Sequence, residues 1–152
     1  MSDFTRFSAE EQLKYDKAVS RRLGKDHWRV TPGYRYYIGK EGSTRYVDVP
    51  DGFLTDGATI PRGLWWLLPP LGEYSQATSL HDYLCRTYQI TELIDGVPTQ
   101  VAVTRAEIDA ILREAMDVLQ VTPWKKRVIN AGVTVYRVTQ RPTKPKTQPM
   151  VI

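Results

Sequence analysis

The pattern of apolar and polar positions predicts strands early in the chain and mostly helices after them. Short runs rich in aromatic and β-branched residues are broken by Pro32-Gly33 and by the glycines between positions 39 and 42, which predicts a small antiparallel β-meander. The turn signal Asp95-Gly96 predicts a further hairpin over residues 90–103. The three runs of the meander are Trp28–Val30, Tyr34–Ile38 and Thr44–Val49.

Helices are predicted by capping signals and by apolar residues at helical spacing. Ser8 with Glu11, and Thr104 with Glu107, fit the capping box, in which each side chain satisfies a free backbone N–H of the first turn. The first helix is expected to end at Gly24. β-branched residues near the end of the last helix leave an extended conformation open there. The predicted helices cover residues 9–23, 59–68, 73–88, 104–119 and 124–139.

Together these elements predict an α+β fold, in which a small antiparallel β-meander packs against several helices. A chain of 152 residues suits one domain. We expect an N-terminal helix within residues 1–24, a single α+β domain over residues 25–140, and a Pro/Lys-rich extended arm over residues 141–152.

Composition bears on whether the chain has disulfides, a membrane span or a signal peptide. The single cysteine, Cys85, cannot form an internal disulfide. No run approaches the ~18 apolar residues that a membrane span needs. The first residues lack the basic start and apolar run of a signal peptide. We therefore expect no membrane span, and synthesis in the cytoplasm.

The net charge of +4 is unevenly distributed. Seven basic residues and no acid lie between Gln120 and Ile152. This segment is interpreted either as a contact with an anionic surface or as a solvated tail. Lys125, Lys126 and Arg127 stand at a predicted helix start, where they are candidates for binding phosphates. No base-reading motif accompanies them, so sequence-specific nucleic-acid binding is not expected.

The candidate chemistry centres on His81. At about 100° per residue, His81 falls on the apolar side of its predicted helix, so its ring should be at least partly buried and needs partners for both nitrogens. Asp56 precedes a predicted helix start, and Asp82 lies just beyond the apolar face that carries His81. Asp109 lies at the edge of the apolar face of the helix after Thr104. These three acids are therefore candidates to converge on His81.

Two interpretations of this cluster are open. In the catalytic one, a His–Asp pair acts as a general base, or His81 and the acids hold a divalent metal that activates water. In the structural one, which we favour, the residues form a buried polar network, and His81 donates to Asp56 or to a backbone carbonyl. The structural interpretation needs no cofactor, and a divalent metal belongs only to the catalytic one.

Trp65 and Trp66 beside Pro69-Pro70 also have two interpretations. On a helix, adjacent side chains point about 100° apart. The two rings therefore fill a core that covers the helix on two sides, or they form an exposed patch that binds a partner, since aromatic residues are enriched at interfaces.

Several segments together resemble one known family, the bacteriophage and prophage family filed as "domain of unknown function 1353". The resemblance extends from about Trp28 to Tyr136 and implies a phage or prophage origin, with no established activity. It is carried by Phe53-Leu54-Thr55-Asp56-Gly57-Ala58-Thr59-Ile60-Pro61-Arg62, then Leu67-Leu68-Pro69-Pro70, then Leu80-His81-Asp82-Tyr83-Leu84, and by the later helix Ala106–Met116.

With this resemblance, we expect a virion-associated structural or assembly protein, bound to the tail or the capsid. It would be made in the host cytoplasm and would reside in the virion, with other phage structural proteins as partners and self-association as a further option. The alternative is a His/Asp or metal-dependent hydrolase that acts on the bacterial cell wall.

Overall fold

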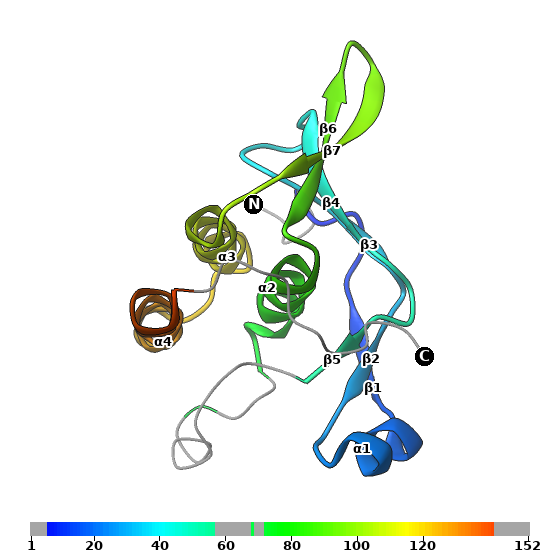
Figure 1. Cartoon of the computed structure of the whole chain (residues 1–152), viewed down its shortest axis with the longest axis vertical. Coiled ribbons are helices and arrows are strands. Elements are labelled where there is room, and N and C mark those ends of the chain that lie inside the picture. The colour runs from blue at the N-terminus through cyan, green and yellow to red at the C-terminus, as the bar shows by residue number, and fades with distance from the viewer. Residues whose placement is uncertain (1–5, 57–67, 69–71, 142–152) are drawn as a thin grey trace.

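The computed structural model describes residues 6–56, 68 and 72–141, which form two antiparallel sheets and four helices (Figure 1). The predicted α+β class is confirmed. The strands are β1 (Gln12–Tyr15), β2 (Trp28–Thr31), β3 (Tyr34–Tyr37), β4 (Arg45–Val49), β5 (Leu54–Thr55), β6 (Gln89–Ile94) and β7 (Val97–Ala102). The helices are α1 (Lys17–Leu23), α2 (Ser75–Thr87), α3 (Arg105–Val118) and α4 (Pro123–Gln140).

The strands fall into two sheets instead of one continuous meander. One sheet has the order β1-β2-β5 and the other has the order β3-β4-β6-β7. The chain passes from the first sheet to the second at Pro32-Gly33, between β2 and β3. A Cβ on Gly33 would lie 2.5 Å from the backbone nitrogen of Asp51. Glycine therefore permits a close approach of two backbone segments at the point where the sheets separate.

The predicted hairpin is confirmed, because β6 and β7 pair across Asp95-Gly96 and project from the body (Figure 1). β7 is an edge of its sheet. Pro98 of β7 lies opposite Leu93 of β6, and the Leu93 N–H donates to the Thr44 carbonyl on the side away from β7. Opposite residues in an antiparallel ladder alternate between pairs that exchange hydrogen bonds and pairs that do not. Because the Leu93 N–H points away from β7, Leu93 and Pro98 form a pair of the second kind, and the Pro98 nitrogen faces the open edge.

The opposite edge of the same sheet is covered by the chain that precedes β1. The Tyr37 N–H donates to the Arg6 carbonyl, and the Ser8 N–H donates to the Arg35 carbonyl, both at 2.8 Å. The N-terminal segment is thus part of the sheet region and not of a helix.

The predicted helix over residues 9–23 is therefore wrong in its first half. Residues 12–15 form β1, and α1 begins at Lys17 after Asp16, whose carboxylate accepts the Val19 N–H at 2.9 Å. Ser8 makes no capping box, since its hydroxyl oxygen accepts the Arg35 N–H at 2.7 Å. Pairing with the sheets outweighed the local capping signal. The predicted end of the helix at Gly24 agrees with the structure.

The helices form successive layers beside the sheets. α2 contacts β4 and β5, α3 packs on α2, and α4 packs on the outer side of α3 (Figure 1). The Thr104–Glu107 capping box at the start of α3 is confirmed. α4 stays helical to Gln140, so the extended alternative for its end is wrong. The largest fully buried side chains are Tyr36, Tyr74, Phe7, Phe53, Leu54, Leu68, Leu80, Leu84, Ile90, Ile108, Leu112 and Met116.

Two predictions concern residues that the structure does not describe. Trp65 and Trp66, with all of the predicted helix over residues 59–68 except Leu68, lie outside the described residues. The predicted arm lies outside them beyond Arg141. Within the described part of the chain, no helix is both long enough and apolar enough to cross a membrane.

Candidate functional site

His81 lies on the side of α2 that faces α3, and it is 8% exposed, as the helical spacing predicted. Its Nε2 lies 2.7 Å from Oδ1 of Asp109 on α3. This bond joins two neighbouring helices through side chains that are separated by 28 positions in the sequence. Of the three candidate acids, Asp109 is the one that the fold brings to His81.

Asp109 is fully buried and is surrounded by cations. Arg105, one turn earlier on α3, donates from Nε to Oδ1 at 3.1 Å. Arg137 of α4 places a guanidinium nitrogen 3.5 Å from Oδ2. Burial alone would raise the pKa of the Asp109 carboxyl, but the hydrogen bonds and charges of His81 and Arg105 hold it below its usual value. The cluster therefore keeps a carboxylate ionised where α2, α3 and α4 meet.

Cys85, one turn later on α2, lies against the ring of His81. The Cys85 sulfur lies 3.7 Å from Nδ1 and 3.8 Å from Nε2. A sulfur almost equidistant from both nitrogens cannot lie along the in-plane direction of either one, which an aligned hydrogen bond requires. The contact is a packing contact against the ring, and it does not form the aligned thiol–imidazole pair of a cysteine nucleophile.

Burial acts to lower the pKa of His81, because it penalises the charged imidazolium. The electrostatic effect of the Cys85 sulfur and the hydrogen bond to Asp109 outweigh burial, and the pKa of His81 rises to about 9. The geometry thus favours a charged imidazolium bonded to a carboxylate at neutral pH.

Asp82 and Asp56 take other partners. Asp82 accepts a hydrogen bond from Arg86 at 3.1 Å, and Arg86 also donates to the Leu54 carbonyl at 2.7 Å, which ties α2 to β5. Asp56 pairs with Lys25 at 2.6 Å. The expected contact between His81 and Asp56 is not formed, because the α2 face that meets β5 carries Asp82 and Arg86, while His81 faces α3.

A second polar cluster was not anticipated from the sequence. Glu11 accepts a hydrogen bond from the Ser79 hydroxyl of α2 at 2.6 Å, and the Tyr34 hydroxyl of β3 lies 2.8 Å from the same Ser79 oxygen. Burial raises the pKa of Glu11 to about 7, against the lowering effect of the Ser79 bond. The available signal was the alternation of Ala9, Glu11 and Leu13, which place their side chains inward from an extended segment.

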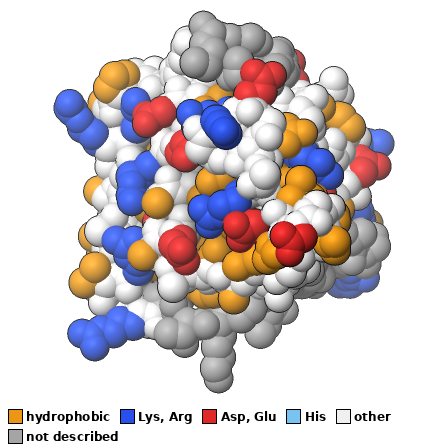
Figure 2. Space-filling model, turned by 90° about the horizontal axis from the view of Figure 1, so that it is seen from above, with side chains coloured by type: hydrophobic (Ala, Val, Ile, Leu, Met, Phe, Trp, Pro, Cys, Tyr) orange, Lys and Arg blue, Asp and Glu red, His pale blue; other side chains and the backbone are white. Residues whose placement is uncertain are grey.

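The basic start of α4 is partly neutralised by the body of the protein. Lys125 lies 3.5 Å from Glu73, and Lys126 lies 2.8 Å from Asp117, while Arg127 is exposed. Another face of the molecule, seen from above, carries Lys and Arg side chains interspersed with Asp and Glu (Figure 2). Neither region is a strongly basic patch of the kind that binds phosphate backbones.

Comparison with known proteins places the chain in a family. A family model described as "Protein of unknown function (DUF1353)" matches residues 28–133. The chain belongs to the DUF1353 family. The match begins at β2, includes His81, Asp82 and Asp109, and ends within α4. No curated protein and no solved structure is detectably similar to this DUF1353 chain.

The described part of this DUF1353 fold has no group of three or more His, Cys, Asp or Glu side chains arranged to hold a metal ion. His81 has one carboxylate neighbour, and that carboxylate is also bonded to Arg105. A cation bound there would be repelled by the guanidinium charges of Arg105 and Arg137. The donor set of this cluster therefore does not fit a divalent metal.

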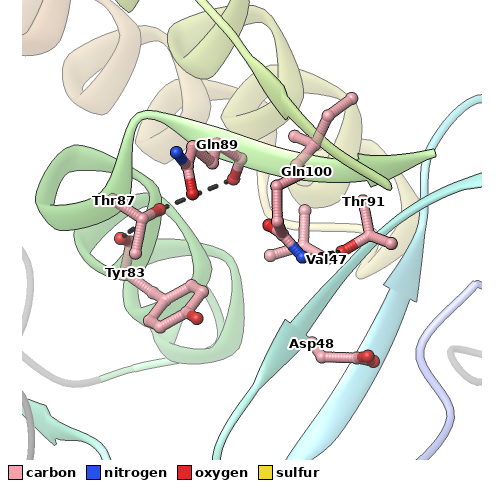
Figure 3. Close-up of a pocket in the computed structure, with 8 residues that line it drawn as sticks. Val47, Asp48, Tyr83, Thr87, Gln89, Thr91 and Gln100 are labelled. Carbon is pink, nitrogen blue, oxygen red and sulfur yellow. Dashed lines mark hydrogen bonds between the residues drawn. The ribbon is translucent and has the colours of Figure 1, made fainter. Parts of the chain in front are cut away.

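The DUF1353 fold has a polar hollow of about 120 Å³ between the end of α2 and strands β4, β6 and β7 (Figure 3). Gln100 donates to the Thr91 hydroxyl at 3.1 Å across its wall. At ~30 Å³ per water, the hollow has room for a few waters, and it is smaller than the ~300 Å³ of small-molecule sites. It is lined by Val47, Asp48, Tyr83, Thr87, Gln89, Ile90, Thr91 and Gln100.

Proposed function

We propose that this DUF1353 protein is a structural or assembly protein of a bacteriophage particle, associated with the tail or the capsid. The observation that carries the non-enzymatic part of the proposal is the state of His81. One ring nitrogen is bonded to Asp109, the buried Cys85 packs against the ring, and the residue is 8% exposed. A general base needs a nitrogen that can reach a proton of the substrate.

The partners of Asp109 support a fastening role for the same cluster. Its carboxylate joins His81 of α2, Arg105 of α3 and Arg137 of α4. Asp109 Oδ1 is hydrogen-bonded, and Oδ2 is near the Arg137 charge without a hydrogen bond. A buried polar network favours one arrangement of the elements that it joins. An assembly protein benefits from this rigidity, since its surfaces must keep a fixed geometry.

The phage setting of the proposal rests on the resemblance of the sequence from Thr55 to Arg62 and of the His81-Asp82 pair to phage and prophage sequences. The direct test is quantitative mass spectrometry of washed, purified virions from the phage or induced prophage that encodes the chain. We expect the protein at a fixed copy number per particle, and incomplete particles when its gene is deleted. Absence from washed virions together with normal particles after deletion would contradict the role.

A second candidate is a cell-wall hydrolase, and the 2.7 Å bond between His81 and Asp109 is the observation in its favour. It predicts that the purified chain clears a suspension of bacterial peptidoglycan, and that His81→Gln abolishes clearing while the variant stays folded. The structural proposal predicts no clearing by either protein, with or without added divalent ions.

A further inference from the structure

Helix α4 has two apolar faces. Ile129 and Val133 are buried toward the body. The opposite face, which we call the outer seam, carries Trp124, Val128, Ala131, Val135 and Val138. Trp124 is 40% exposed, and Val135 and Val138 are each 61% exposed.

The outer seam has the spacing of a helix–helix interface. Its residues follow one another at steps of four, three, four and three positions. At about 100° per residue they occupy an arc of roughly 80°, centred away from Ile129 and Val133. This spacing presents one continuous stripe to a neighbouring helix, whose side chains interlock with it.

The position of α4 in the fold leaves Trp124, Ala131, Val135 and Val138 exposed, whereas Val128, at one edge of the stripe, is partly buried against the core. α3 packs against its inner face, and α4 is the outermost helix layer (Figure 1). A helix with apolar residues on both faces is usually covered on both. The outer seam therefore has the character of a contact surface and not of a solvated helix face.

The charges beside the outer seam indicate which kind of helix would bind there. Arg127 is exposed beside its start, Arg141 is exposed after its end, and no acid occurs from Gln120 to Arg141. A second copy of α4 would bring another basic flank against this one, with no carboxylate on either helix to neutralise it. A partner with acidic flanks would gain attraction at the same positions.

We propose that the outer seam binds an amphipathic α-helix of another protein, with an apolar stripe of matching spacing and with acidic residues beside that stripe. In the proposed assembly role, on which this proposal rests, the partner helix would belong to another protein of the particle. The seam from Trp124 to Val138 is about 21 Å long, which corresponds to four turns of a partner helix. A contact of this size suits a modular, reversible attachment.

The test uses the full chain and a synthetic three-heptad peptide with leucine and isoleucine at the stripe positions and glutamate beside them. A second peptide carries lysine in place of the glutamates. Binding is measured by fluorescence anisotropy of the labelled peptides. We expect the glutamate peptide to bind, the lysine peptide to bind at least about tenfold more weakly, and added salt to weaken the glutamate peptide.

Matched variants locate the binding site. Replacing Val135 and Val138 with Gln together removes the exposed apolar groups and preserves helix propensity, so the variant is expected to fold and to lose binding by about tenfold or more. The control replaces Ile94 and Val97 with Gln at the hairpin tip, where the side chains are 48% and 59% exposed. The control should bind like the unchanged chain.

Three outcomes would overturn the inference. The glutamate peptide fails to bind, or both peptides bind equally, or the chain sediments as a dimer that the Val135 and Val138 replacements disperse. The last outcome assigns the seam to a second copy. If the peptide fails to bind but the protein is found in washed virions, the assembly role stands and only the partner class is wrong.

Discussion

Asp109 is the residue on which the contacts between three helices depend. It is fully buried, and its two carboxylate oxygens meet an imidazole and two guanidinium groups. Removing one partner of a buried charge network leaves the remaining charges without compensation, and this costs more than the loss of one hydrogen bond.

The replacement Asp109→Asn tests this dependence. We expect the free energy of unfolding to fall by ~3–5 kcal/mol, because three cations lose their shared counter-charge. The measurement is urea unfolding followed by tryptophan fluorescence. The matched control is Asp117→Asn on the same helix, where the carboxylate is 67% exposed and pairs with Lys126. Equal stability of the two variants would contradict the network.

For single residues, the sequence predicted which way a side chain points better than it predicted which residue that side chain contacts. The helical period placed His81 inward, and the structure agrees. Its partner was expected to be Asp56, the acid of the same motif, but Asp109 lies across the packing of α2 on α3. Helix periodicity is a local property, whereas the pairing of two helix faces depends on how the helices pack.

Among the elements, the two ends of the first predicted helix behaved differently. The helix ends at Gly24 as expected. The predicted capping box at its start does not form, because residues 12–15 pair with β2 as a strand. The hairpin at Asp95-Gly96 and the Thr104 capping box were predicted from local signals and are confirmed, because both depend on residues that are close together in the sequence. The division of the strands into two sheets depends on long-range pairing, which no local signal contained.

Two glycines test opposite roles for the same residue type. Gly33→Ala places a Cβ 2.5 Å from the Asp51 backbone nitrogen, so it should lower the free energy of unfolding by ~2 kcal/mol or more. Gly132→Ala lies inside α4 with open space at the Cβ position, so it should raise that free energy by ~0.5–1 kcal/mol. Thermal unfolding monitored by circular dichroism measures both. A neutral Gly33→Ala variant would show that the two backbone segments can move apart.

At the scale of the whole molecule, two groups, Glu11 and His81, both make the free energy of unfolding fall as pH rises, each over its own pH range. Folding raises the pKa of Glu11 from 4.5 to about 7, so the folded state disfavours its ionised form, and stability is lost as pH rises from 4.5 through 7. Folding raises the pKa of His81 from 6.5 to about 9, so its stabilising effect is complete below 6.5 and lost as pH rises through 9.

Urea unfolding at pH 5, 7 and 9 should therefore give a free energy of unfolding that declines at each step. Glu11→Gln should stabilise the protein by on the order of 2 kcal/mol at pH 8 and by much less at pH 5, since it removes a buried charge only where that charge exists. Glu10→Gln, at an exposed neighbouring position, should have little effect at either pH. A stabilisation by Glu11→Gln that is the same at both pH values would contradict the burial of an ionisable Glu11.

The open edge of the four-stranded sheet bears on how this protein avoids polymerising through its own strands. The edge at β3 is covered by residues 6–8, but β7 ends its sheet with Pro98 turned outward. A proline there offers no N–H to an approaching strand, which interrupts edge-to-edge addition. Pro98→Val restores that donor and adds a β-branched side chain. We expect concentration-dependent association of this variant, visible as increased light scattering, under conditions where the unchanged chain stays dispersed.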